Sequence, residues 1–429
     1  MITTTKQLAD ILTAHDLGMS TRNNWPSRYL HLVLPYFNCI KEGKLDEVPA
    51  PTCVQMQVSA TCSTQCEMCH HWKEPRIEMN LDEWRRVFAD VSEFGVRTAI
   101  FSGGEPLMRM DLPELLHSAF QTGLKLGVLT NGTMVSRESE ARHRVIAALA
   151  ECADWVSISV DGTKTADLAI RNPIVVDRIR LLQEFVSGLR EVNQRIKIWA
   201  TVTLQNGNIQ MNFHEACKFI QETLGISEVN FKIATGARRA LEHEPPYLLK
   251  EEELVRLVNF LQHDPLPNQT GNQLAYLREC FSHGIFNIQD TAQGAPLHSF
   301  YEERDLRCFT PFLFSLIDND GEIYPCCHLY RDNQGTDPRS KYFREEHSMG
   351  NIKRASFSKI WNGDKYVAER MALETINPDN ERFLPCGECT RHCQHNLVLT
   401  QVYKNFKDSL EKLEEELKTL GNKGNPVFF

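Results

Sequence analysis

The chain has 429 residues, of which 42% are hydrophobic and 24% charged, as in a globular protein with two domains or one large domain and an appendage. Its formal net charge of −9 argues against a general nucleic-acid binder, which needs a basic face to neutralise phosphates. No stretch approaches the roughly 18 uninterrupted apolar residues of a membrane span, and the N-terminus lacks the pattern of a secretory signal. We therefore expect a cytoplasmic protein that binds neither nucleic acid nor a membrane.

Short apolar segments alternate with amphipathic helices over residues 51–235, after an N-terminal helical extension over residues 1–50. The predicted strands are 53–58, 98–102, 125–129, 155–160, 197–203 and 228–233. The predicted helices between them are 81–94, 113–121, 138–151, 175–191 and 212–223. This alternation predicts an α/β fold with a parallel sheet and outer helices, and such sheets carry their chemistry at the C-terminal ends of the strands.

The rest of the chain is less regular. We expect a linker over residues 236–305, with a helix at 250–262, and a cysteine-containing region over residues 306–400. Two short strands are predicted in that region, 313–317 and 322–324. Residues 401–429 hold a charged amphipathic helix and a tail, whose expected role is packing or solvation.

Fourteen cysteines in a reducing compartment point to metal binding rather than to a disulfide framework. Five stand singly and are expected to be small buried hydrophobes: Cys39, Cys53, Cys152, Cys217 and Cys280. The other nine form three groups: Cys62, Cys66 and Cys69; Cys308, Cys326 and Cys327; and Cys386, Cys389 and Cys393.

The first group, Cys62, Cys66 and Cys69, directly follows the first predicted strand and supplies three thiolates. A cubane iron–sulfur cluster has four iron corners, so three protein ligands leave one iron open to a cofactor. A structural zinc site is normally closed by a fourth ligand, which His70 or His71 could supply. At this point the spacing alone leaves the metal open.

Gly103-Gly104-Glu105-Pro106 follows the second predicted strand and therefore falls on the same edge of the sheet as the cysteines. Gly103 and Gly104 lack Cβ atoms, which lets backbone approach a ligand closely. In isolation such a tetrapeptide is a turn, but beside three clustered cysteines it indicates a binding site.

These motifs, with Ser157-Ile158-Ser159-Val160-Asp161-Gly162 at the end of the fourth predicted strand, resemble the radical S-adenosylmethionine (SAM) enzymes over residues 50–235. The resemblance implies a partial (β/α)6 TIM-like barrel in which the three cysteines hold a 4Fe–4S cluster. In that family the open iron binds SAM, and an electron from the cluster cleaves SAM to methionine and a 5′-deoxyadenosyl radical. The radical takes a hydrogen atom from an unactivated C–H bond, so the cofactor carries the difficult chemistry.

By the same resemblance, Met68 lies near the adenine of SAM, Glu105 accepts a hydrogen bond from its ammonium group, and Arg171 pairs with its carboxylate. Gly103 and Gly104 belong to the same cofactor-binding motif. Asn131 and Ser159, at the ends of the third and fourth strands, contact other parts of the cofactor. Plain structural interpretations remain: loop packing for Met68, a turn for Asn131 and a surface helix for Arg171.

The C-terminal cysteines resemble the SPASM domain, or its shorter twitch form, that many of these enzymes carry. The segments typical of it are Asp320-Gly321-Glu322-Ile323-Tyr324-Pro325-Cys326 and Met349-Gly350-Asn351-Ile352 before Ile360-Trp361. The last run is CxxCx3C with no later cysteine, which indicates one auxiliary 4Fe–4S cluster held by Cys308, Cys326, Cys386 and Cys389. Cys393 could replace either of the last two, and Cys327 is interpreted as a neighbour. A four-cysteine zinc site is the alternative.

The sequence therefore predicts an oxidoreductase or maturase reduced by a donor such as flavodoxin or ferredoxin, whose auxiliary cluster transfers an electron or binds substrate. A small polar metabolite such as a sugar or cyclitol is favoured as substrate, because residues 1–50 are short for a fused leader-peptide domain and the cysteine spacing resembles small-molecule dehydrogenases. A ribosomal peptide or protein is the alternative substrate. A non-catalytic iron–sulfur protein for electron transfer or redox sensing is the alternative of another class.

No acid or base stands out in the sequence. Asp161, Glu322 and His328 lie near the motifs, and Asp161 could equally cap the helix that follows it.

Overall fold

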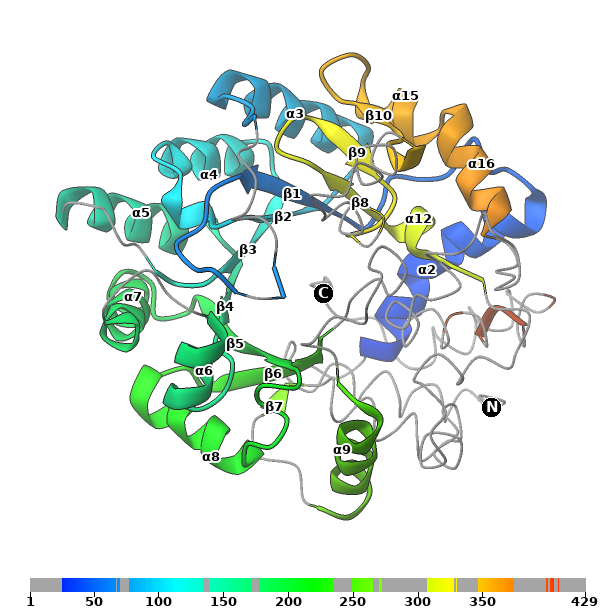
Figure 1. Ribbon diagram of the computed structural model, residues 1–429. Helices are drawn as coiled ribbons and strands as arrows, with labels where there is room; N and C mark the ends of the chain where they lie inside the picture. Colours follow the sequence, from blue (N-terminus) through cyan, green and yellow to red (C-terminus); the bar gives the residue numbers. More distant parts are fainter. Residues whose placement is uncertain are drawn as a thin grey trace.

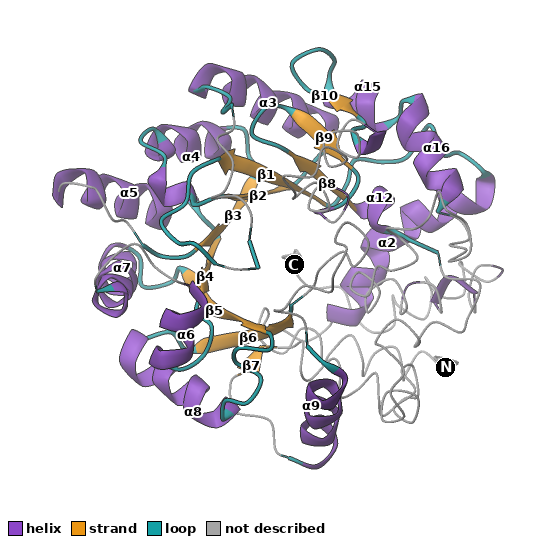
Figure 2. Cartoon of the chain, viewed as in Figure 1, coloured by secondary structure: helices purple, strands orange, loops and turns teal. Residues whose placement is uncertain are grey.

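The computed structural model describes residues 25–66, 68–69, 77–133, 139–171, 177–234, 249–264, 270–271, 307–327, 329, 346–373, 399, 402–404 and 408. In this part of the chain one sheet has the strand order β10–β9–β8–β1–β2–β3–β4–β5–β6–β7. Neighbours from β8 to β7 in this order are parallel, whereas β9 and β10 are added antiparallel. The sheet curves around an inner face, and helices cover its outer face (Figures 1 and 2).

The six central strands are those that the sequence predicts. They are β1 (Cys53–Ser59), β2 (Thr98–Gly103), β3 (Lys125–Thr130), β4 (Trp155–Ser159), β5 (Lys197–Leu204) and β6 (Glu228–Ile233). The helices between them are α3 (Leu81–Phe94), α4 (Leu112–Gln121), α5 (Ser139–Cys152), α6 (Lys164–Arg171), α7 (Arg178–Val192) and α8 (Phe213–Lys218). The predicted α/β fold with a partial TIM-like barrel is confirmed. The helix predicted at 212–223 changes to a π-helical turn after α8, at Phe219–Thr223.

Local start and stop signals explain why α3 has the bounds that the sequence predicts. The Asn80 side chain accepts a hydrogen bond from the Glu83 amide, and the Glu83 carboxylate accepts one from the Asn80 amide, which forms a capping box at the start of α3. Gly95 ends the helix with φ +108°, a left-handed conformation that glycine adopts at little cost. Asp111, by contrast, makes no side-chain cap at α4, because its carboxylate binds Arg109 instead.

The C-terminal cysteine region joins the barrel through a shared strand. β8 (Phe314–Ile317) pairs in parallel with β1, Cys53 opposite Phe314 and Met56 opposite Ile317. β9 (Glu322–Tyr324) and β10 (Gly350–Asn351) continue the sheet beyond β8, and the short helix α12 (Thr310–Leu313) precedes it. At the opposite edge, the region predicted as a linker contributes α9 (Glu251–His263) and β7 (Thr270–Gly271).

A buried arginine ties the C-terminal region to the N-terminal segment. Arg370 on α16 (Asp364–Ala372) is fully buried, with its guanidinium carbon 4.5 Å from the ring centroid of Trp361. It donates to the carbonyls of Leu45 and Pro311. Trp361, which ends α15 (Phe357–Trp361), donates its indole N–H to the Pro49 carbonyl at 2.9 Å. The segment after α2 (Trp25–Glu42) is therefore held against both α15 and α16.

An apolar layer lines the inner face of the sheet near the N-terminal ends of its strands. Cys53, Ile100, Trp155 and Trp199 form it, separately from the main core that packs between the sheet and the helices. The rings of Trp155 and Trp199 stack with centroids 4.8 Å apart. Gly127 leaves room for this layer, because a Cβ there would lie 1.9 Å from the Trp155 ring.

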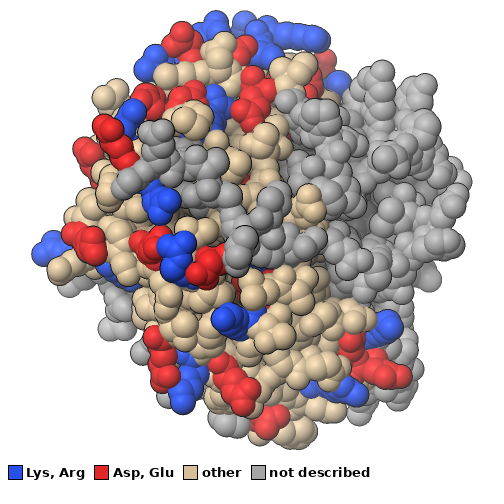
Figure 3. Space-filling view, turned by 60° about the vertical axis from the view of Figure 1, so that its left-hand side comes forward, with Lys and Arg blue, Asp and Glu red and all other residues tan. Residues whose placement is uncertain are grey.

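Ion pairs connect neighbouring helices on the outer surface, where acidic and basic side chains intermingle (Figure 3). Arg144 on α5 pairs with Glu114 on α4, and Arg142 pairs with Glu184 on α7. Exposed pairs of this kind contribute about 0.5 kcal/mol each. Among the helices in the described part of the chain, none is both long and apolar enough to cross a membrane.

The inner layer generates a stability prediction. Gly127→Ala should lower the free energy of unfolding by about 3 kcal/mol, because the added methyl overlaps the Trp155 ring on rigid backbone. Gly207→Ala is the matched control, since its Cβ would stay 3.5 Å from Ile170, and it should change stability by less than about 0.5 kcal/mol. Urea unfolding followed by circular dichroism measures both variants. Equal midpoints would contradict the tight packing described here.

Candidate active site

Backbone contacts join the cysteine loop to the Gly-Gly-Glu-Pro segment. The amide of Gly104 donates to the Ser59 carbonyl at 2.7 Å, and the amide of Glu105 donates to the Thr61 carbonyl at 2.6 Å. A Cβ on Gly103 would lie 2.2 Å from the Ser59 oxygen, and one on Gly104 would lie 2.2 Å from the Thr61 oxygen. Both glycines therefore allow close contact with the strand end that leads into Cys62, and their close approach to a ligand stays a prediction.

The three cysteines of the first group share the loop after β1. Cys66 is buried, and Cys62 and Cys69 are partly exposed. The Asn131 side-chain amide donates to the Cys62 sulfur at 3.7 Å, and the Arg171 guanidinium donates to the Cys66 sulfur at 3.8 Å. Burial raises the pKa of the Cys62 thiol to about 11, and the nearby Glu105 carboxylate adds to the rise.

The donor set of this loop fits an iron–sulfur cluster. Three thiols with N–H groups directed at two of their sulfurs suit soft thiolate ligation, and hydrogen bonds to sulfur tune such clusters. Within the described ranges, no three cysteine, histidine or acidic side chains are already gathered around one metal-sized point. Ligation of the cluster would require deprotonation of the thiols.

Glu105 is anchored by the protein itself. Its side chain is 1% exposed and accepts hydrogen bonds from the Thr130 hydroxyl at 2.6 Å, the Asn131 amide at 2.6 Å and the Leu107 amide at 2.9 Å. Burial raises the pKa of this carboxyl to about 7, although the three hydrogen bonds oppose the rise. The carboxyl group thus connects the end of β2 to the end of β3, and its contact with a cofactor ammonium stays a prediction.

The other predicted cofactor residues lie at the C-terminal ends of neighbouring strands. The Asn131 side-chain amide also donates to the Ser63 hydroxyl at 3.0 Å, within the cysteine loop. Ser159 is the last residue of β4. Met68 packs against Ala234, beyond the end of β6, and accepts a weak hydrogen bond from Gln205. Their roles toward SAM remain predictions.

Arg171 is not a surface residue. It is 8% exposed and forms an ion pair with Asp161 at 2.6 Å. Asp161 is fully buried, and burial raises the pKa of its carboxyl while the Arg171 charge opposes the rise. The interpretation of Asp161 as a helix cap is wrong, because its side chain accepts from the Thr203 amide on β5 and Thr163 takes the capping position at α6.

Sequence reasoning missed Arg178, the first residue of α7. Its side chain is fully buried and reaches the ends of β3 and β4, through the carbonyls of Asn131 and Ser159. An arginine beside Asp177, which caps the helix, has the sequence appearance of a surface residue. No pattern in the sequence marks it.

The auxiliary group is described only in part. Cys308 precedes α12, and Cys326, which is buried, follows β9, with its sulfur accepting from the Leu329 amide at 3.3 Å. Cys327 is partly exposed beside it. The remaining predicted ligands lie outside the described residues: Cys386, Cys389 and Cys393. The same is true of His70, His71 and His328.

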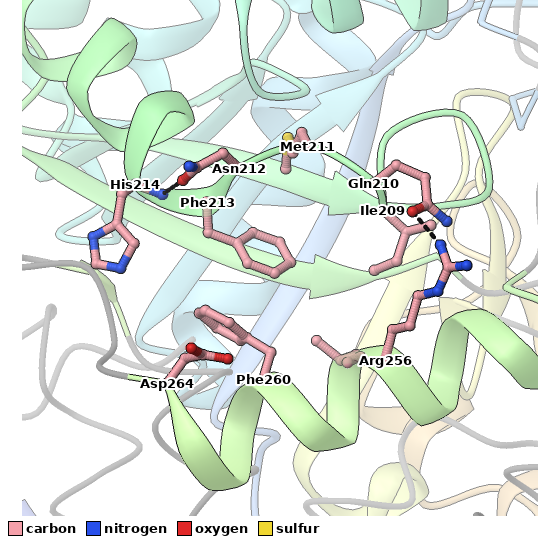
Figure 4. A pocket seen from close by; sticks show the side chains of 10 residues that line it. Ile209, Gln210, Met211, Asn212, Phe213, His214, Arg256, Phe260 and Asp264 are labelled. Carbon is pink, nitrogen blue, oxygen red and sulfur yellow. Dashed lines mark hydrogen bonds between the residues drawn. The ribbon is translucent and has the colours of Figure 1, made fainter.

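A pocket of about 330 Å³ lies between α9 and the segment that leads into α8 (Figure 4). At one end of the pocket the rings of Phe213 and Phe260 are in contact, with centroids 4.6 Å apart. At the other end Arg256 donates a hydrogen bond to the side chain of Gln210. None of the predicted cofactor residues lines this pocket. It is therefore separate from the cysteine loop.

Two family models match the chain at the places where these sites lie. Residues 56–220 match the radical SAM superfamily, and residues 308–394 match the SPASM iron–sulfur cluster-binding domain. The first range contains the cysteine loop and the strand ends around it. The second contains the predicted auxiliary ligands.

Relatives of known activity resemble the chain over different lengths. The AdoMet-dependent heme synthase of Oleidesulfovibrio alaskensis is 23% identical over 353 residues, 81% of this chain and 82% of that protein. The PqqA peptide cyclase of Rhodopseudomonas palustris is 35% identical over 129 residues, 29% of this chain and 33% of that protein.

Solved structures share the fold at low identity. The crystal structure of Streptococcus suis SuiB bound to S-adenosylmethionine has a TM-score of 0.53 and 16% identity, with 82% of this chain and 74% of that chain covered. The structure of anSMEcpe with bound AdoMet and the Cp18Cys peptide has a TM-score of 0.52 and 13% identity, with 85% of this chain and 100% of that chain covered.

A partial TIM-like barrel with a cysteine triad at its C-terminal rim defines an enzyme class that uses an iron–sulfur cluster and SAM. The chain is a radical SAM enzyme with a C-terminal SPASM iron–sulfur domain. The prediction of its family, its 4Fe–4S cluster with SAM and its auxiliary iron–sulfur centre is thereby confirmed, and the non-catalytic alternative is wrong.

Because Glu105 is buried, the free energy of unfolding should depend on pH. The pKa of its carboxyl rises from an ordinary value of 4.5 to about 7 in the folded protein, so the unfolded chain ionises first and stability falls as pH rises between these values. SAM-free wild type should lose up to about 3 kcal/mol over this range, beyond any change in Glu105→Gln, which cannot ionise. Glu140→Gln, at an exposed site on α5, should behave as wild type. Parallel pH profiles of wild type and Glu105→Gln would contradict the assignment.

Proposed function

We propose that this enzyme abstracts a hydrogen atom from an uncharged substrate rich in hydroxyl or amide groups, held against the inner face of the barrel sheet. The supporting observation is the character of that face above its apolar layer. On β3 the apolar Leu129 lies beside Ser157, but on the four strands that carry the apolar layer the side chains one step further along are neutral and polar: Gln55, Ser102, Ser157 and Thr201. They follow Cys53, Ile100, Trp155 and Trp199 by two residues, which places them on the same face.

These polar side chains form hydrogen-bonded pairs across the sheet. The side-chain amide of Gln55 donates to the Ser102 hydroxyl at 2.7 Å, and that hydroxyl donates to the side-chain oxygen of Gln57 at 3.1 Å. The hydroxyls of Ser157 and Thr201 lie 2.8 Å apart. Such groups can exchange these bonds for bonds to a substrate with similar donors and acceptors, without burying an unpaired charge.

The charged groups nearest the rim are engaged by the protein. Asp161 pairs with Arg171, and the buried carboxyl of Glu105 accepts three hydrogen bonds. This leaves the neutral groups as the ones suited to bind the substrate. They fit the hydroxyl groups of a small polar metabolite of the sugar or cyclitol kind, which is the substrate class we propose.

In this proposal Cys62, Cys66 and Cys69 hold the SAM-binding cluster, while Asn131 and Arg171 direct N–H groups at its thiolates. When bound, the cluster and SAM supply the 5′-deoxyadenosyl radical that removes the hydrogen atom. Met68, Gly103, Gly104, Glu105 and Ser159 complete the cofactor site at the same rim. The apolar layer below closes the inner face, which limits the access of water to a reactive radical.

The auxiliary centre is proposed as a single 4Fe–4S cluster held by Cys308, Cys326, Cys386 and Cys389, with Cys393 as the substitute ligand. β8 lies between Cys308 and Cys326 and pairs with β1, which leads into the first cysteine loop. This connection suits a centre that accepts an electron from the substrate radical or binds the substrate.

A ribosomal peptide is the second candidate substrate. It is favoured by the 35% identity to a PqqA peptide cyclase, although that match covers 29% of this chain. A peptide would also present neutral amides to the polar inner face. The two candidates therefore differ in the size of the substrate rather than in the groups that recognise it.

Reductive cleavage of SAM tests the chemistry. Anaerobically reconstituted enzyme with dithionite and SAM should form 5′-deoxyadenosine. Cys66→Ala should abolish this product, because a ligand of the cleaving cluster is lost, whereas Cys389→Ala should retain uncoupled cleavage. Liquid chromatography with mass detection measures the product. If Cys66→Ala and Cys389→Ala both fold and neither forms any 5′-deoxyadenosine, the proposal that only the first cluster cleaves SAM is contradicted.

Isotope transfer tests the substrate class. Carbon-deuterated myo-inositol, glucose and N-acetylglucosamine, which are all uncharged, are each offered to the reduced enzyme, and deuterium in 5′-deoxyadenosine marks hydrogen abstraction from the added compound. We expect incorporation from at least one of them. Incorporation only from a deuterated peptide encoded beside the gene would overturn the metabolite proposal in favour of the peptide.

A further inference from the structure

One fully buried arginine connects the strand ends that carry the predicted cofactor contacts. All five N–H groups of the Arg178 guanidinium have acceptors. The Nη1 group donates to the Asn131 carbonyl at 2.6 Å and to the Thr133 hydroxyl at 2.7 Å. The Nη2 group donates to the Ser159 carbonyl at 2.7 Å. One side chain therefore sets the spacing between the end of β3 and the end of β4.

Asp167 on α6 neutralises and orients this guanidinium. Its two carboxylate oxygens accept from Arg178 Nε at 2.8 Å and Nη2 at 3.4 Å, a forked arrangement that fixes the plane of the guanidinium. Both side chains are fully buried. Removal or reshaping of either partner would leave the other charge buried and poorly paired, which is strongly destabilising.

The pair also reaches the first cysteine group. Asp167 accepts a hydrogen bond from the Asp161 amide at 2.9 Å, and the Asp161 carboxylate pairs with Arg171. Arg171 in turn donates to the Cys66 sulfur at 3.8 Å. Two ion pairs, each made of one arginine and one aspartate, thus form a buried network with no net charge. The network connects the ends of β3 and β4 to the cysteine loop.

We propose that Arg178 and Asp167 are positioning residues for SAM, which hold Asn131, Ser159 and Arg171 in the arrangement that receives the cofactor. Neither is proposed to touch SAM. The inference rests on the proposed cofactor site. Its physical basis is that a lysine at position 178 would keep the charge but could not serve two carbonyls, a hydroxyl and a carboxylate from one planar group.

The test measures SAM binding before any reduction, so that it does not depend on catalysis. Arg178→Lys and Asp167→Asn are reconstituted with iron and sulfide and titrated with SAM by calorimetry. Both should load iron as wild type does, yet bind SAM about 10- to 100-fold more weakly, as is typical when a group that orients ligands is lost. Arg180→Lys is the matched control, since Arg180 lies two residues along α7 and is exposed. It should bind SAM as wild type does.

A second readout needs no cofactor. Hydrogen exchange of the amides in residues 131–133 and 159–161 should accelerate in Arg178→Lys and not in Arg180→Lys, because the clamped strand ends are released. The double variant Arg178→Lys/Asp167→Asn should bind SAM no more weakly than the weaker single variant, because both changes remove the same interaction.

Folded, iron-loaded Arg178→Lys with wild-type SAM affinity would overturn the proposal. Failure of both single variants to fold would also overturn it, because Arg178 would then be a purely structural residue. Wild-type enzyme that binds SAM but never cleaves it would contradict the proposed function and leave the positioning role to be judged by the binding data alone.

Discussion

The candidate site depends on one steric constraint, the backbone-to-backbone contact between the end of β1 and the segment after β2. Gly103 and Gly104 lie so close to Ser59 and Thr61 that any Cβ would overlap a carbonyl oxygen. Because the two segments also exchange hydrogen bonds, the start of the cysteine loop and the backbone of Glu105 are fixed together. Glu105 then reaches the end of β3, and Arg178 joins β3 to β4. The candidate cofactor site at this end of the barrel thus depends on contacts that begin here and continue from strand to strand.

Strand β1 also connects the two iron–sulfur regions. β1 pairs with β2 on one side and with β8 on the other, so the cysteine loop lies at the end of a strand that both regions share. The single sheet gives the SPASM region a fixed register against the barrel, and Arg370 and Trp361 hold its helices to the N-terminal segment. This fixed register would keep the distance between the two centres constant, which suits electron transfer between them or a substrate that contacts both.

Much of the barrel could be predicted because its signals are local. The capping box of Asn80 and Glu83 defines the start of α3, and alternation of apolar strands and helices gives the parallel order. The pairing of β1 with β8 could not be predicted, because residues 53–56 and 314–317 are distant in sequence and no local pattern encodes their register. Arg178 was missed for a related reason, since its burial results from tertiary contacts that override the usual exposure of arginine. Motifs located the cysteine loop, Glu105 and Arg171. The pairing of Arg171 with Asp161 and the buried pair of Arg178 with Asp167 follow only from tertiary contacts.

The central claim is that Cys62, Cys66 and Cys69 leave one iron of their cluster for SAM. Electron–nuclear double resonance of the reduced enzyme with SAM labelled by 15N in the amino group and 17O in the carboxylate measures this directly. We predict hyperfine couplings from both labels, which are lost in Cys66→Ala. Bound SAM without either coupling, at a cluster that is intact and reduced, would contradict the claim.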